Sequence, residues 1–307
     1  MITPMGQAAA SGSEGGAATL ADVVGVMDGL YPPGSAESWD AVGLVAGDPA
    51  APVRKVLLAV DPVAAVVDEA LEWGADLVIT HHPLFLKGVH SVAATTFKGS
   101  VVHRLLTAGC GLYVAHTNAD SAPRGVADAL ADLLGIVDRG PLVAHTDGAQ
   151  TGIGRVGRLA EPATLAAFAR RVAAALPATA QGVRVAGDLE ATVTTAAVVG
   201  GSGDSLFDAV RAAAADVYVT ADLRHHPASE LRERATFEGP EGRPEAGTPF
   251  LVDVAHYASE WPWLTYAADD LQAGVAALLA QRGEEGTVTC RVSTNVTDPW
   301  SATFRAP

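Results

Sequence analysis

The sequence predicts an α/β protein with two lobes, each built of three layers around a mostly parallel sheet. Apolar strand-like segments alternate with helical segments along most of the 307 residues. This alternation is typical of parallel strands joined by crossover helices. Hydrophobic residues make up 49% of the chain and charged residues 18%, which fits a soluble globular protein. The length allows two domains, or one large one, with a substantial core.

The first block of the chain reads as repeated strand and helix units. An opening helix at 20–30 ends at Tyr31-Pro32-Pro33, where the prolines stop helical spacing. Strands are expected at 53–61, 75–80 and 111–116, with helices at 62–74 and 98–110 between them. Such sheets bind ligands beyond the carboxyl ends of their strands.

Two further blocks follow. The second contains a strand at 152–159, a helix at 162–176 and a strand–helix–strand unit at 195–220. GADLVITHHP at 74–83 resembles AADVYVTADLRHHP at 214–227, which suggests that the second lobe duplicates one α/β unit. The third has a strand and helix at 248–261, an apolar helix to about 281 and a strand at 287–294. We therefore expect a flexible tail at 1–17, a first lobe from 18–135 and 236–307, and a second lobe at 136–235.

The net charge and the number of cysteines indicate which partners and which cellular compartment to expect. A net charge of −15 and only three lysines argue against a nucleic-acid-binding surface, which needs clustered Lys and Arg. Two cysteines are too few for a disulfide framework, so a reducing, cytoplasmic compartment is expected. Residues 1–20 lack the basic and apolar regions of a signal peptide. No apolar run is long enough for a bilayer, so no membrane partner is expected.

Histidines and carboxylates gather at the ends of the predicted strands. They are His81 with His82, His116 with Asp120, and His256 with Glu260. Imidazole and carboxylate are the mixed ligand set that suits Zn, Mn, Fe, Co or Ni. If the chain turns at His81 and His82, both rings can reach one cavity, and on a helix His256 and Glu260 share a face. Each pair alone also fits a hydrogen-bonded loop or a solvated helix, but their joint position favours a metal site.

The number of candidate ligands predicts more than one ion. Five or six ligands exceed the four of a tetrahedral zinc site, whereas two ions about 3.5–4 Å apart would use them all. Glu260 is the candidate bridging carboxylate. We therefore expect two divalent ions per chain, of a kind that the residues do not decide.

Six motifs together carry a family resemblance: ESWDAVGLVAGDP, ITHHPLF, AHTNAD, VVGGSGDS, VTADLRHHP and VDVAHYASEW. In this order they resemble the Nif-three-like family of dinuclear-metal hexameric proteins, whose members are called GTP cyclohydrolase type 2 homologues. The resemblance runs from about residue 18 to the end. It implies a homohexamer and two ions held by the five residues His81, His82, Asp120, His256 and Glu260. It also implies that His116 either lies next to the ligands without binding the ions or is an occasional ligand.

Small departures from the family pattern place Ala at 41, 221 and 255, where Asn or Gly is usual, so pocket shape can differ. The insert of some longer relatives is missing between Asp120 and His256.

Three other features each allow two interpretations. GGSGDS at 200–205 could bind an anion through its amides, but a structural turn is favoured because no P-loop Lys follows. Asp222, His225 and His226 either contact substrate, with His225 as a catalytic acid or base, or only begin a helix. Trp39 could stack on a planar base, although a buried indole is the more ordinary interpretation.

These observations predict a metal-dependent hydrolase of a nucleotide-like or heterocyclic small molecule, with Glu260 and His225 as its catalytic residues. A dinuclear site lowers the pKa of bound water, which suits hydrolysis of C–N, ester or phosphate bonds. The alternative is a metal-binding or regulatory scaffold ring without turnover.

Overall fold

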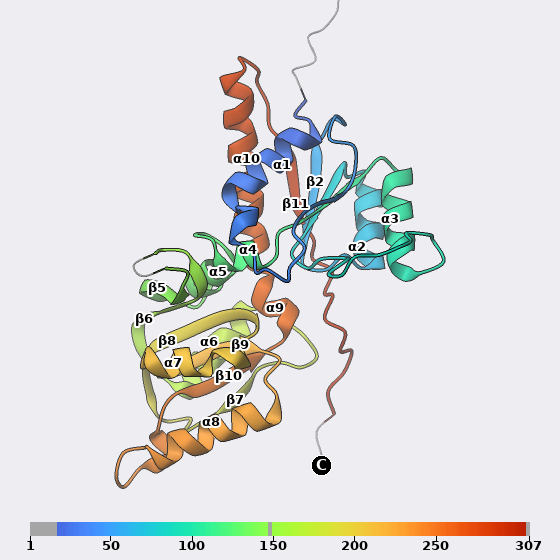
Figure 1. The fold of residues 1–307 in the computed structure, drawn as a ribbon. Coiled ribbons are helices and arrows are strands. Elements are labelled where there is room, and N and C mark those ends of the chain that lie inside the picture. The colour runs from blue at the N-terminus through green and yellow to red at the C-terminus, as the bar shows by residue number, and fades with distance from the viewer. Residues whose placement is uncertain (1–16, 147–148, 305–307) are drawn as a thin grey trace, which may run out of the picture.

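The structure is a computed structural model that describes residues 17–146 and 149–304. It contains two sheets, each flanked by helices, which form an upper and a lower lobe (Figure 1). The α/β class with two lobes is therefore confirmed. Most of the tail expected at 1–17 lies outside the described residues.

The upper lobe is built on a five-stranded sheet in the order β1-β4-β3-β2-β11. Its strands are β1 (Gly43–Ala46), β2 (Lys55–Ala59), β3 (Leu77–Thr80), β4 (Gly111–Val114) and β11 (Thr289–Val292). All neighbours are parallel except β1, which runs antiparallel to β4. The helices of this lobe are α1 (Leu20–Leu30), α2 (Ala64–Trp73), α3 (Phe97–Thr107) and α10 (Trp263–Gln281), with a 3-10 turn η1 (Pro33–Ser35).

Alternation along the strands explains the three layers. Leu57 of β2 packs with α2 and α3 on one face, whereas its neighbours Val56 and Leu58 pack with α1 and α10 on the other. Parallel strands buried on both faces read as nearly continuous apolar runs, which makes these segments recognisable in the sequence.

The lower lobe has a six-stranded sheet in the order β5-β6-β8-β9-β10-β7. Its strands are β5 (Ile136–Ala144), β6 (Gly152–Thr164), β7 (Arg184–Ala186), β8 (Thr192–Ser202), β9 (Val217–Ala221) and β10 (Phe250–Val254). Only β8, β9 and β10 are mutually parallel, so this sheet is mixed rather than mostly parallel. The helices nearby are α5 (Val126–Leu133), α6 (Leu165–Ala175), α7 (Phe207–Ala212) and α8 (His225–Phe237), with 3-10 turns η2 (Asp204–Leu206) and η3 (Pro244–Ala246).

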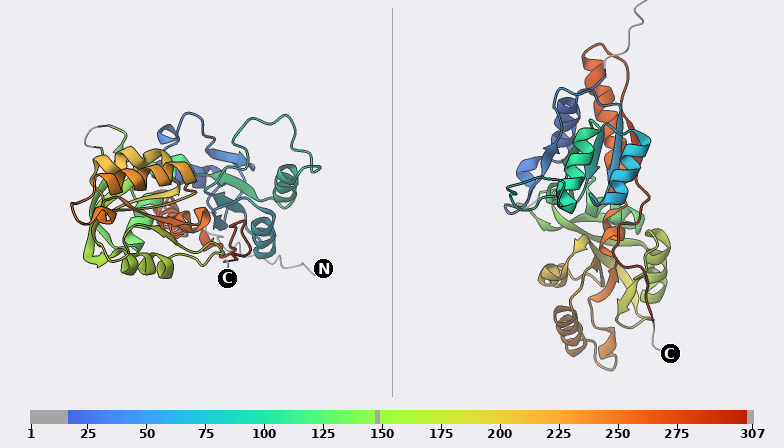
Figure 2. Two further views of the ribbon diagram at one scale, coloured as in Figure 1. Left: turned by 90° about the horizontal axis from the view of Figure 1, so that it is seen from below. Right: turned by 90° about the vertical axis from the view of Figure 1, so that its right-hand side faces the viewer.

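The lobes share a core and are joined by two short helices, α4 (Thr117–Ser121) and α9 (His256–Glu260). One hydrophobic cluster contains side chains of both lobes, for example Leu20 of α1 in the upper lobe and Phe168 of α6 in the lower lobe. Strand β10 pairs with β9, although the division expected from the sequence puts residues 236–307 in the first lobe. The chain therefore leaves the lower sheet through α9 and enters the upper lobe as α10. Figure 2 shows the lobes end to end with this passage between them.

The predicted likeness of the two HHP segments holds only in part. Strands β3 and β9 each lie between two parallel neighbours and follow a helix. His81 and His82 continue β3, because their amides bond to Ala59 and Val60. His225 and His226 instead open helix α8. The same tripeptide therefore begins a helix in one lobe and extends a strand in the other.

Candidate metal centre

The candidate centre lies where the carboxyl end of β3 meets helix α9. His81 and His82 come from the upper sheet, and His256 and Glu260 from the helix that follows β10 of the lower sheet. The four-residue spacing places His256 Nε2 2.9 Å from Glu260 Oε1, as expected for one helical face. The centre therefore depends on both lobes.

His81 and His82 are directed into one cavity by the two strands beside β3. His81 Nδ1 donates to the carbonyl of Ala115 at the end of β4, at 3.0 Å, and His82 Nδ1 lies 2.7 Å from Asp61 Oδ1 after β2. Each Nε2 thus turns toward Glu260, at 3.5 Å from Oε1 for His81 and 3.2 Å from Oε2 for His82. A ring whose Nδ1 is engaged in this way keeps Nε2 as the metal-binding nitrogen.

Two more imidazoles are oriented by carboxylates. His256 Nδ1 lies 2.7 Å from Asp222 Oδ2, and His116 Nδ1 lies 2.9 Å from Asp40 Oδ1. Asp222 has a left-handed backbone, with φ of 55°. This conformation costs energy in a residue other than glycine and is found more often at functional sites. Carboxylates that contact the Nδ1 atom in this way fix the tautomer and the ring direction of metal-binding histidines.

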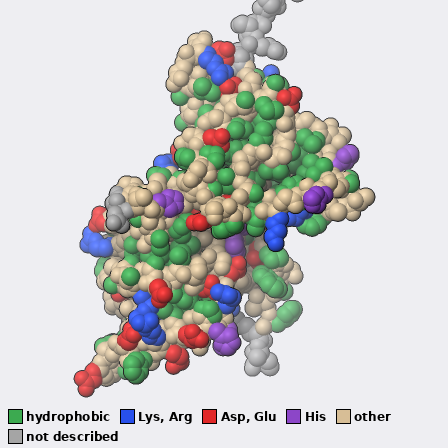
Figure 3. Space-filling model, in the orientation of Figure 1, with side chains coloured by type: hydrophobic (Ala, Val, Ile, Leu, Met, Phe, Trp, Pro, Cys, Tyr) green, Lys and Arg blue, Asp and Glu red, His purple; other side chains and the backbone are tan. Residues whose placement is uncertain are grey.

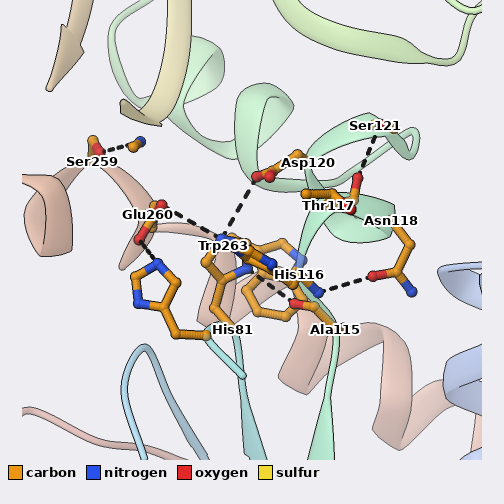
Figure 4. A network of polar contacts seen from close by, with 12 residues as sticks. His81, Ala115, His116, Thr117, Asn118, Asp120, Ser121, Ser259, Glu260 and Trp263 are labelled. Carbon is orange, nitrogen blue, oxygen red and sulfur yellow. Dashed lines mark hydrogen bonds and ion pairs between the residues drawn. The ribbon is translucent and has the colours of Figure 1, made fainter. Parts of the chain in front are cut away.

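Ligand atoms converge in two overlapping groups that could each hold an ion. One group contains His81, His82 and His116, and the other contains His82, His256 and Glu260. Asp120 lies beside the first group, with Oδ1 3.7 Å from His81 Nε2. Figure 4 shows Asp120 and Glu260 approaching His81 from different sides. The five residues predicted as ligands are thus brought together, and His116 joins them.

Burial and charge set the protonation of this cluster. Burial alone would raise the pKa of Glu260, but the histidines His82, His81 and His256 hold it well below its usual range. Burial opposes charge on His256, yet Glu260 and Asp222 raise its pKa to about 9. Asp120 behaves oppositely, because burial raises its pKa to about 6. Metal ions would displace protons from these imidazoles, so metal affinity should increase with pH.

A buried carboxylate and a buried imidazole nitrogen without hydrogen-bond partners also fit a cation. Within the described part of the chain, Glu260 Oε2 and His81 Nε2 have ion-pair contacts of 3.2 Å and 3.5 Å but no contact with the geometry of a hydrogen bond. Both residues are almost fully buried, at 3% and 0% exposed. Unpaired buried polar atoms are costly, and a bound cation would satisfy both. The donor set of nitrogen and oxygen suits a divalent transition metal.

The glycine-rich motif GGSGDS forms the wall behind Glu260. Gly201 has φ of 69°, and a Cβ placed there would lie 2.6 Å from Glu260 Oε1 and 3.0 Å from His256 Nε2. Its amide donates to Ser259 Oγ at 2.8 Å, and its carbonyl accepts from Thr220 Oγ1. The amide of Gly201 is therefore not available for an anion, which supports the structural interpretation of this turn.

Other predicted residues take different positions. His225 is exposed and belongs to neither ligand group. It lines a separate pocket of about 410 Å³ with Arg232 and other residues of the lower lobe. Trp39 was expected to be buried, but it is 56% exposed and lines a pocket of about 250 Å³ that also reaches Asp120. Trp263 is fully buried, and its ring centre lies 5.4 Å from that of His81.

Sequence reasoning missed three orienting or lining residues. Asp61 follows the apolar run of β2 at the same sheet edge as His81, a position that could have revealed it. Asp40 lies in the first family motif, yet the motif does not indicate that it accepts from both His116 and Thr117. Trp300 lines a pocket of about 350 Å³ together with His82 and His256, but it lies in a segment without periodicity that gives no sign of this.

Comparison with known proteins identifies the family. The model of Duf34/NIF3 (NGG1p interacting factor 3) matches residues 18–288. The chain belongs to the Duf34/NIF3 family. A Streptomyces coelicolor relative named GTP cyclohydrolase 1 type 2 homolog is 51% identical, with 92% of this chain and 94% of the relative covered.

A Mycobacterium tuberculosis relative of the same name is 36% identical, with 92% and 96% covered. That alignment extends over 389 residues, so the mycobacterial relative carries additional residues, in keeping with the missing insert.

Solved structures of the family share the fold. A Bacillus cereus protein related to NIF3 superposes with a TM-score of 0.79 at 23% identity, covering 93% of this chain and 99% of that one. A hypothetical protein of Staphylococcus aureus gives 0.76 at 26% identity, covering 94% and 100%. The fold described above is thus shared by a NIF3-related protein and by the staphylococcal protein.

Proposed function

We propose that this Duf34/NIF3 protein binds two divalent metal ions and is a metal-dependent hydrolase of a nucleotide-like or heterocyclic small molecule. The observation that carries the proposal is the convergence of His82, His256 and Glu260 from two sheets. Glu260 belongs to one ligand group, and its Oε1 also lies 3.5 Å from Nε2 of His81, a member of the other group. It is therefore the proposed bridging ligand. The relatives' name, GTP cyclohydrolase 1 type 2 homolog, supports the same substrate class.

Metal ions would supply an activated water and a clamp for developing oxyanions. The protein's own residues would orient the metal ligands and pack against them. Asp61, Asp222 and Asp40 orient the imidazoles through Nδ1. Trp263 packs near His81, and Gly200 and Gly201 lie against one side of the buried Glu260. We also propose His225 as a proton donor or acceptor. It lines the pocket of about 410 Å³ on the lower lobe.

The test is hydrolysis by metal-loaded protein of a panel containing GTP, other nucleotides and phosphoesters. Wild type is compared with Glu260→Gln, and with Glu233→Gln on the exposed side of α8 as a matched control. Turnover that Glu260→Gln loses and Glu233→Gln keeps would support the hydrolase. Equal background from all three proteins on every substrate would favour the scaffold without turnover.

We propose a homohexamer as the assembly, and an exposed apolar segment supports self-association. Leu86, Val89 and Val92, between β3 and α3, are 42%, 48% and 47% exposed, and Phe97, the first residue of α3, is 76% exposed. Contiguous exposed apolar residues mark interaction surfaces. Light scattering should report a mass near six times 31.2 kDa. A mass of one chain at micromolar concentration would refute the proposal.

The partner class is a small molecule. Lys and Arg side chains are scattered rather than clustered on the face shown in Figure 3, which gives no support to a nucleic-acid groove there. Within the described residues, no helix has the length and apolar character to cross a bilayer. The cytoplasmic location remains a proposal from composition.

A further inference from the structure

The C-terminal segment Ser293–Phe304 leaves β11 and descends along the junction to the lower lobe (Figure 1). Ser293 Oγ donates to Glu69 Oε2 at 2.5 Å, and Thr303 Oγ1 donates to the carbonyl of Ala180 at 2.5 Å. Between these ends, Thr297 donates to Asp61, the residue that orients His82. The segment is therefore held across both lobes, beside the candidate metal centre.

Two adjoining pockets lie between this segment and the lower lobe. The inner one, of about 350 Å³, is lined by His82 and His256 of the centre. The outer one, of about 520 Å³, opens toward Arg184. Both are lined by Gln181, Asp222 and Trp300, so they form one path that leads to the imidazoles. Small-molecule sites commonly have volumes of roughly 300–1,000 Å³.

Trp300 stands at the point where the two pockets meet. It is 66% exposed, which leaves a large aromatic face toward solvent in the described structure. Any planar base can stack on such a face, because every base has a π-face. Covering Trp300 would also remove apolar surface from water. A planar ring is thus the ligand that this position suits.

Hydrogen-bond acceptors surround the inner pocket. Asp61, Asp222 and Asp298 all line it. Asp61 and Asp222 already contact His82 and His256, whereas no described group donates to the buried Oδ2 of Asp298. The cation of the outer pocket, Arg184, is already paired with Asp253. Carboxylates accept hydrogen bonds from N–H groups and repel anions. The wall beside Trp300 therefore suits a ring that carries amino or ring N–H groups.

We propose that Trp300 stacks on the planar ring of the substrate and that Asp298, on the same segment, accepts from its N–H groups. The substrate class is an amino-bearing purine or a similar heterocycle, placed with its reacting edge toward His82 and His256. This inference deepens the proposed hydrolase and rests on it for the role of the metal centre. The recognition itself is a binding property, which can be measured without turnover.

The test is calorimetric binding of guanosine and of inosine, which lacks the exocyclic amine, to zinc-loaded protein. Trp300→Ala should weaken guanosine binding about tenfold or more, Trp300→Phe should keep most of it, and Phe237→Ala, an exposed aromatic at the end of α8, should change nothing. Asp298→Ala should remove the preference for guanosine over inosine. Zinc content should equal that of wild type in all four variants.

Distinct outcomes separate this inference from the proposed hydrolase. Unchanged guanosine affinity in Trp300→Ala, no preference over inosine, or no binding by wild type would each overturn it. Turnover of some other substrate, unaffected in Trp300→Ala, would leave the hydrolase standing while refuting the role of Trp300. Conversely, Trp300-dependent binding without turnover of any substrate would refute the hydrolase and keep the recognition site.

Discussion

His82 Nε2 lies 3.2 Å from His256 Nε2, although the two residues are 174 positions apart in the chain. One comes from the end of the upper sheet and the other from the helix that leaves the lower sheet. Because the Nδ1 of each ring is directed at a carboxylate, the two Nε2 atoms need a proton or a cation between them at this distance. The relationship makes the candidate metal centre depend on the packing of the two lobes.

The first prediction concerns stoichiometry. Elemental analysis of protein purified without chelator should approach two transition-metal ions per chain, because two ligand groups overlap at His82. His256→Ala should remove one ion or more. His90→Ala, an exposed histidine of the loop after β3, is the matched control and should keep both. A value near zero for wild type under metal-replete conditions would contradict the dinuclear centre.

The second prediction concerns the residue that orients His256. Asp222→Ala removes the acceptor for His256 Nδ1, so the ring loses its fixed direction and part of its basicity. Metal affinity should fall about 10–100-fold, the usual effect of losing such a partner. Asp208→Ala, an exposed carboxylate on α7, should bind metal like wild type. Competition with a metallochromic chelator measures both, and equal affinities would show that Asp222 does not act on the centre.

The third prediction separates backbone strain from contact with the centre. Gly201 and Gly182 have similar left-handed backbones, with φ of 69° and 65°. An added Cβ meets Glu260 at 2.6 Å in Gly201→Ala, whereas nothing lies within 4 Å in Gly182→Ala. Both variants should lose roughly 1 kcal/mol or more of unfolding free energy. Only Gly201→Ala should lose metal as well, and equal metal content in the two would contradict the role of the glycine wall beside Glu260.

The fourth prediction concerns acid stability. Burial would raise the pKa of Asp128, but its hydrogen bonds to Arg155 and Arg139 hold it below its usual range. A carboxyl with a lowered pKa in the folded state stabilises the protein above its unfolded pKa. This contribution is complete at neutral pH and declines as pH falls below about 4. Denaturant unfolding at several pH values should show this loss, and Asp128→Asn should reduce it.

Replacing Arg155 tests how much the buried ion pair with Asp128 contributes to stability, in comparison with an exposed ion pair. Arg155 is 2% exposed and also donates to three carbonyls, so Arg155→Met leaves Asp128 with less compensation in a buried site. The expected loss is about 3–5 kcal/mol of unfolding free energy. Arg158→Met breaks an exposed ion pair with Asp138 and should cost about 0–1 kcal/mol. Similar losses in the two variants would show that burial does not decide the strength of these pairs.

The sequence is sufficient to predict the elements whose periodicity is strong, and the candidate ligands. Strands β2, β3 and β4 are buried on both faces and follow one another through helices, so their ends can be placed at one edge. His81, His82, His256 and Glu260 stand at such ends. The four-residue spacing of the last two is enough to put them on one helical face.

Other features could not be predicted because they depend on distant contacts. The assignment of β10 to the lower sheet rests on pairing with β9, which local propensity does not encode. Strands β5 and β7 are partly exposed and lack a regular alternation of apolar and polar residues, so their sequences do not predict strands. Trp39 is exposed because it borders a pocket rather than a core, and Trp300 is placed by the hydrogen bonds of an irregular segment.

The last prediction concerns His225, the predicted acid or base, which lies in the pocket beyond Leu223 and Arg184. Those two residues also line the outer of the two pockets that lead to the centre, so His225 could reach the far end of a bound substrate. His225→Ala should leave metal content unchanged, since it belongs to neither ligand group. If it transfers a proton to the leaving group, turnover should fall by about 10²–10⁴. His226→Ala is the control, because this neighbour is exposed and lines none of these pockets. A higher KM with unchanged kcat would make His225 a substrate contact, and unchanged kinetics would reduce it to the start of α8.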